Sequence, residues 1–88
     1  MKTLAPNEMS ALRIAGANRE GRLITFEAPD GPLHVMGFKG VGPISLGQEG
    51  LTRLITRRFI KYSGESSYLL TRTGWEAINQ QPPEHLIL

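Results

Sequence analysis

Cationic and hydrogen-bonding side chains are concentrated between residues 48 and 72. They are Gln48, Thr52, Arg53, Thr56, Arg57, Lys61, Ser63, Ser66 and Arg72. From Arg53 to Arg72 the chain holds five basic residues and a single acid, Glu65. Arginine can bind guanine through two hydrogen bonds, glutamine binds adenine, and threonine reaches phosphate or the thymine methyl group. These residue types therefore predict contacts with nucleic acid.

A helix over residues 45–58 would place most of these side chains on one face. At 100° per residue, Leu51, Leu54 and Ile55 form an apolar stripe. The opposite arc carries, in order, Gln48, Thr52, Thr56, Glu49, Arg53 and Arg57. Because any surface helix has a polar outer face, this helix alone is explained better as a solvated surface.

A hairpin predicted over residues 59–70 favours nucleic-acid contact over a merely solvated surface. It adds Lys61 on a strand and a small polar tip, Ser63 to Ser66, with Arg72 just beyond its far end. Such a tip can lie beside a phosphate backbone, where hydroxyls and amides bond oxygen. A solvated hairpin without a ligand is the alternative interpretation.

The remaining segments supply the scaffold of one domain, residues 1–88. The first half is predicted to contain a helix over 5–18 capped by Asn7, a hairpin over 22–38 and a glycine-rich connector over 39–44. The end of the chain is predicted to contain a helix over 71–80, capped by Thr71 or Thr73, and a tail over 81–88. Ser45 and Gln48 stand in capping-box spacing for the helix 45–58. The predicted order is α-β-β-α-β-β-α.

Two stretches, "LTRLITRRFIKY" and "SSYLLTRTGWEAI", resemble the second half of a winged-helix DNA-binding domain of small bacterial transcriptional regulators. The closing signature of that family matches residues 70–78, and the resemblance covers residues 45–80. It implies an α+β fold with a small antiparallel sheet packed on three helices. By the resemblance, residues 45–57 form the recognition helix and 62–67 the wing. Groove-facing positions would be Gln48, Thr52, Arg53, Thr56 and Arg57, and backbone-contacting positions Lys61, Ser63, Ser66 and Arg72.

The chain departs from that family at two places. The family commonly has glycine where Arg58 stands, because the recognition helix ends in a left-handed turn. The family also has a helix before the recognition helix, and here the hairpin 22–38 and the connector stand instead. The second departure bears on how the recognition helix would be braced against DNA.

Other kinds of site find little support in the sequence. There is no cysteine, His34 and His85 are far apart in the chain, and the acids are scattered. We therefore expect no catalytic residue, no metal site and no cofactor. The net charge is only +2, and no stretch reaches the ~18 apolar residues of a membrane span. A cytoplasmic protein without a membrane partner is expected.

The leading prediction is a non-catalytic protein that binds double-stranded DNA, either a small transcriptional regulator or an accessory factor. The alternative is a winged-helix module that binds another protein and no nucleic acid. A single-strand or RNA binder is a third possibility, because Tyr62 and Tyr68 could pair beside the turn. The apolar tail "HLIL" could fold back on the core or cover a second copy in a homodimer.

Overall fold

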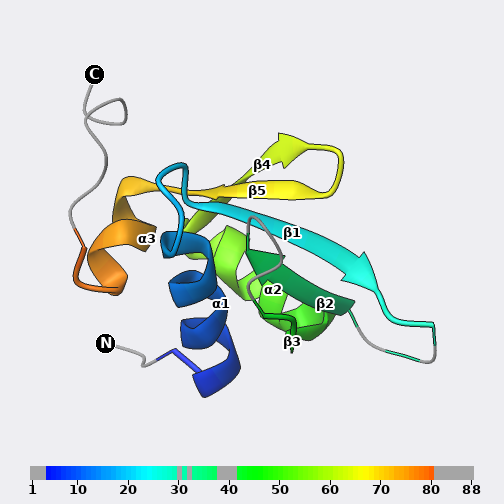
Figure 1. The fold of residues 1–88 in the computed structure, drawn as a ribbon. Coiled ribbons are helices and arrows are strands. Elements are labelled where there is room, and N and C mark those ends of the chain that lie inside the picture. The colour runs from blue at the N-terminus through cyan, green and yellow to red at the C-terminus, as the bar shows by residue number, and fades with distance from the viewer. Residues whose placement is uncertain (1–3, 30, 32, 38–41, 81–88) are drawn as a thin grey trace.

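Three helices and five strands follow one another in the part of the chain that the computed structural model describes, residues 4–29, 31, 33–37 and 42–80 (Figure 1). They are α1 (Pro6–Gly16), β1 (Arg22–Glu27), β2 (Leu33–Gly37), β3 (Ile44–Ser45), α2 (Gly47–Thr56), β4 (Ile60–Gly64), β5 (Ser67–Leu70) and α3 (Arg72–Ala77). The predicted α+β class, with a small antiparallel sheet and three helices, is confirmed. The two-residue strand β3 was not predicted. The tail 81–88 lies outside the described residues.

The sheet joins the two hairpins through its central strand. Its order is β3-β2-β1-β5-β4, and every neighbouring pair is antiparallel. On one side of β1, Ile24 is opposite Met36, and on the other side Leu23 is opposite Tyr68. The hairpin β4–β5 is therefore paired to β1 along one edge and does not stand free of the body.

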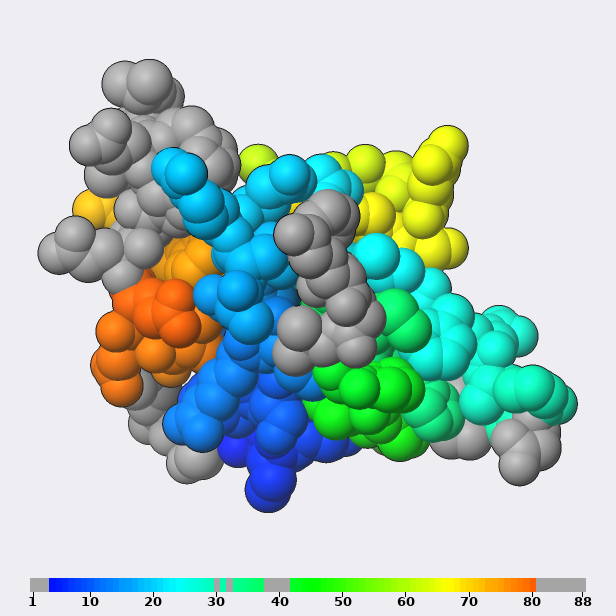
Figure 2. Space-filling model, in the orientation of Figure 1, coloured from blue at the N-terminus to red at the C-terminus, as the bar shows by residue number. Residues whose placement is uncertain are grey.

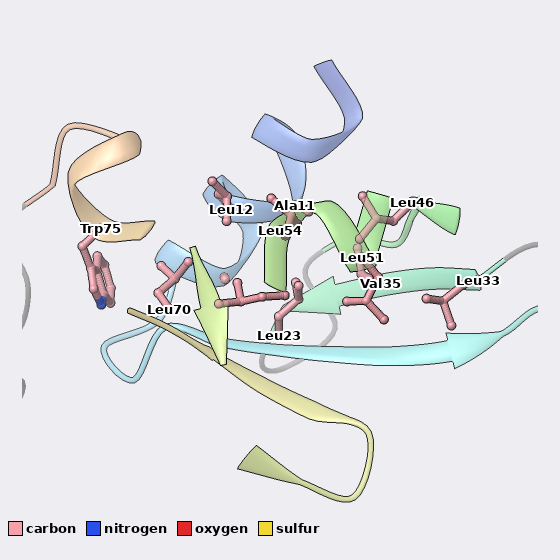
Figure 3. Packing of buried hydrophobic residues seen from close by; sticks show 12 residues of the cluster. Ala11, Leu12, Leu23, Leu33, Val35, Leu46, Leu51, Leu54, Leu70 and Trp75 are labelled. Atoms are coloured by element: carbon pink, nitrogen blue, oxygen red, sulfur yellow. The ribbon is translucent and has the colours of Figure 1, made fainter. Parts of the chain in front are cut away.

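Successive side chains of the strands point to opposite faces of the sheet, and one of these faces lies against the helices. Leu23, Val35 and Leu70 are fully buried there. They pack with Ala11 and Leu12 of α1, Leu51 and Leu54 of α2, and Trp75 of α3 (Figure 3). The apolar stripe predicted for α2 thus faces the core at Leu51 and Leu54, while Ile55 at its margin remains 40% exposed.

The second face of the sheet points away from the helices. Ile24 and Met36 are opposite one another on it, and Phe26 and His34 form the next pair, with ring centroids 5.6 Å apart. All four side chains are half-buried and lie outside the core cluster. The molecule is therefore two layers thick, with helices on one side of the sheet.

The predicted helix caps at Asn7 and Ser45 are wrong. The N-cap of α1 is Ala5, followed by Pro6, and the Asn7 side chain donates instead to the Leu46 carbonyl at 3.4 Å. Ser45 belongs to β3, where it pairs with His34, so the N-cap of α2 falls on Leu46. In both cases a tertiary contact engages the side chain or backbone that the local pattern assigned to capping.

The turn between α2 and β4 has a left-handed residue, although glycine is absent. Arg58 adopts a left-handed φ of 65°. Its amide donates to the Ile55 carbonyl at 2.9 Å, and the Phe59 amide donates to the Leu54 carbonyl at 2.9 Å. These two hydrogen bonds define a Schellman motif, which normally favours glycine at the position of Arg58.

The closing signature secures the start of α3 against this turn. Thr71 caps α3, as predicted, by accepting a hydrogen bond from the Gly74 amide at 3.1 Å. The Thr71 hydroxyl also donates to the Arg58 carbonyl, and the Thr71 amide donates to the Phe59 carbonyl at 3.1 Å. The signature therefore joins the end of α2 to the beginning of α3.

Candidate nucleic-acid interface

Three of the predicted site residues form a line on the outer side of α2. Gln48, Thr52 and Thr56 follow one another at four-residue spacing, and all three are exposed. We call them the outer ridge. Because Leu51 and Leu54 anchor the opposite side of the helix in the core, the ridge is held facing outward. Its side chains can both donate and accept hydrogen bonds, which suits the edges of bases.

Arg53 lies at the border of the ridge and is engaged by carboxylates. Its Nε is 2.6 Å from Oε2 of Glu8, a residue of α1 that is only 2% exposed. A weaker approach of 3.9 Å joins its Nη1 to Glu49, whose side chain is 93% exposed. The arginine predicted to enter a groove therefore makes a tertiary ion pair with α1.

Three arginines lie at or beside the carboxyl end of α2. Arg57 is half-buried with its guanidinium 5.1 Å from the centre of the Phe59 ring, and Arg58 is exposed. The contacts of Thr71 with the Arg58 and Phe59 carbonyls bring the backbone of Arg72 to the same place. Arg72 is 73% exposed and lies 3.6 Å from Glu76, which is also exposed. We call Arg57, Arg58 and Arg72 the arginine corner.

Lys61 lies on the other face of the sheet. It alternates with Ile60, which is buried in the core, and it is opposite Leu69, which is in turn opposite Arg22 of β1. Successive side chains of a strand point to opposite faces. The structure thus separates Lys61 from the outer ridge by the thickness of the sheet.

The tip of the β4–β5 hairpin is a two-residue turn that protrudes at one corner of the molecule (Figure 2). Glu65 and Ser66 both have positive φ, 51° and 63°. The Ser66 carbonyl accepts from the Thr25 amide at 2.8 Å and from its hydroxyl at 3.1 Å. Ser63, at the irregularity in the pairing, shares a hollow with Arg22 and Ile24. The tip is thereby fixed to β1.

The nine predicted residues consequently fall into several groups. The ridge holds three, the arginine corner holds Arg57 and Arg72, and Arg53 stands between them in its ion pair with Glu8. Lys61 and Ser63 lie toward the far face, and Ser66 lies at the tip. The cations from 53 to 72 are therefore divided between the helix side of the molecule and, at Lys61, the far face of the sheet.

Two residues of this region, Glu8 and Arg58, are not among the nine residues predicted from the sequence. Glu8 stands four residues before the buried Leu12 and seven before the buried Ala15, so it falls on the core face of α1. A carboxylate on a core face requires a partner, and this was the available signal. For Arg58 the signal was its position, where the family that the sequence resembles commonly has glycine.

Comparison with protein-family models, with curated proteins and with solved structures finds no significant match to this chain. The helices of the described residues are all too short or too polar to cross a bilayer.

Proposed function

We propose that this protein binds double-stranded DNA without catalysis, as a small regulator or accessory factor of the winged-helix type. The outer ridge of α2 would lie along the major groove, and the arginine corner would contact the phosphate backbone beside it. The exposed, core-anchored line of Gln48, Thr52 and Thr56 carries this proposal.

The dimensions of the ridge suit a groove. From Gln48 to Thr56 the helix rises about 12 Å, which corresponds to about three to four base pairs at 3.4 Å each. Glutamine can bond adenine through two hydrogen bonds, and threonine can contact the thymine methyl group. Glu49, beside the ridge, could accept from a cytosine amino group, although it would repel a phosphate.

The arginine corner supplies the charge that the proposal needs. Arg58 makes no ion pair with any carboxylate of the described residues. The pair between Arg72 and Glu76 is exposed on both sides, so exchanging the carboxylate for a phosphate costs little. Together with Arg57, which packs on the Phe59 ring, these arginines could supply three phosphate contacts although the net charge is only +2.

The brace behind the recognition helix differs from the usual one. In the family resembled, a helix precedes the recognition helix. Here β3 leads directly into α2, and the Leu46 amide donates to the Leu33 carbonyl of β2 at 3.0 Å. The hairpin β1–β2, together with α1, would thus hold α2 at the DNA.

A titration of random duplex DNA at two salt concentrations tests the proposal. Three phosphate contacts predict a slope of log K against log salt of about −2.7, hence an affinity about 40-fold lower at 200 mM than at 50 mM salt. Thr52→Ala with Thr56→Ala should weaken binding without changing this slope, whereas Arg58→Gln should reduce the slope. Absence of binding at 50 mM salt would refute the proposal and favour the protein-interaction alternative.

A further inference from the structure

A buried carboxylate on α1 holds an arginine of α2. Glu8 is 2% exposed, its Oε2 accepts from Arg53 Nε at 2.6 Å, and its Oε1 accepts from the Ala5 amide at 3.4 Å. Among the described residues, Arg53 is the cation that pairs with Glu8. An ionised carboxylate left buried without a cation is costly. The fold therefore requires Arg53 to stay paired with Glu8, although about half of the Arg53 side chain is exposed.

The same region fixes how α2 lies against α1. A Cβ at Gly50, one turn before Arg53, would be 3.8 Å from the Glu8 Cγ, an ordinary van der Waals distance, so α1 packs against α2 there. The Asn7 side chain adds a hydrogen bond of 3.4 Å to the Leu46 carbonyl at the start of α2. Two polar contacts thus connect α1 to the beginning and the middle of α2.

We infer that Arg53 is a positioning residue: it acts through Glu8 to orient α2 so that the outer ridge faces DNA, and it does not itself contact DNA. A phosphate could recruit this guanidinium only by removing it from Glu8. This inference rests on the proposed function, but it assigns Arg53 a different role from the groove contact expected from the sequence.

The double variant Glu8→Gln with Arg53→Gln separates positioning from contact. It leaves the net charge unchanged and removes the ion pair. We expect the affinity for duplex DNA to fall about tenfold, because α2 loses one of the contacts that orient the ridge, while the salt slope stays as in the wild type. A lost phosphate contact would instead reduce the slope by about 0.9.

Arg58→Gln serves as the matched control, since it removes an arginine proposed to contact phosphate and should show that reduced slope. Binding is measured at about 15 °C, near the temperature of maximal stability of small domains, with folding of each variant verified by circular dichroism. Unchanged affinity in the double variant, or a slope reduced as in the control, would overturn the inference.

A stability measurement without DNA tests the ion pair by itself. Arg53→Gln alone should lower the urea midpoint more than the double variant does, because only the single variant leaves the Glu8 carboxylate buried without its cation. Failure of Glu8→Gln to rescue Arg53→Gln would also overturn the inference. If the wild type binds no duplex, the proposed function and this role of Arg53 both fail. In that case, rescue of Arg53→Gln stability by Glu8→Gln would still show that the ion pair joins α1 to α2.

Discussion

Gly74 of α3 offers the sharpest test of how the closing signature works. A Cβ added to Gly74 would lie closer than 3.0 Å to the Phe59 carbonyl oxygen, a separation that real Cβ atoms essentially never show. It would also lie 3.0 Å from a methyl group of Leu70. The carbonyl cannot easily retreat, because it accepts from the Thr71 amide and directly follows the Schellman motif of α2. Gly74→Ala must therefore displace α3.

The expected loss follows from three effects. Overpacking costs about 1–3 kcal/mol, and weakening the hydrogen bond from the Thr71 amide adds about 1 kcal/mol. Alanine returns up to about 1 kcal/mol through its better helix propensity. We therefore expect the free energy of unfolding to fall by about 1–4 kcal/mol. With an m value of about 1 kcal/mol/M, the urea midpoint should fall by about 1–4 M.

Equilibrium urea unfolding, followed by circular dichroism, measures this loss. The matched control is Gly31→Ala, because a Cβ at Gly31 meets nothing within 4 Å; it should change stability by less than about 0.5 kcal/mol. If Gly74→Ala is as mild as this control, the close approach does not explain the signature glycine and the reasoning is refuted.

Two further substitutions test the contact between the end of α2 and the start of α3. Arg58→Gly should raise the free energy of unfolding by about 1 kcal/mol, since a left-handed backbone costs other residues about 1–2 kcal/mol; a lower thermal midpoint would contradict this. Thr71→Ala should cost about 1–2 kcal/mol through loss of the α3 cap and of the bond to the Arg58 carbonyl, whereas Thr71→Ser keeps the hydroxyl and should retain most of the stability in the same thermal scan. For binding, Gln48→Ala should reduce discrimination among duplexes at adenine-containing positions, by about 1–3 kcal/mol, and an unchanged preference in a competition assay would exclude Gln48 from base contact.

The second half of the chain was the more predictable half. The 3.6-residue period of α2, the polar turn between β4 and β5, and the Thr71 cap depend on neighbours a few residues away, and the structure contains each of them. The left-handed Arg58 also follows from a local requirement, because the chain must leave α2 through a Schellman turn.

Contacts between distant segments decided the remainder. Glu8 and Arg53 are 45 residues apart in the sequence, and only the packing of α1 on α2 brings them together. The resulting ion pair engages an arginine that the sequence predicted to face a groove. Pairing of Ser45 with His34 likewise converted an expected helix cap into a strand. The sequence by itself determined which side chains are cationic or can form hydrogen bonds; the tertiary structure decided which of them form ion pairs, because a buried charge must find its partner wherever the fold brings one.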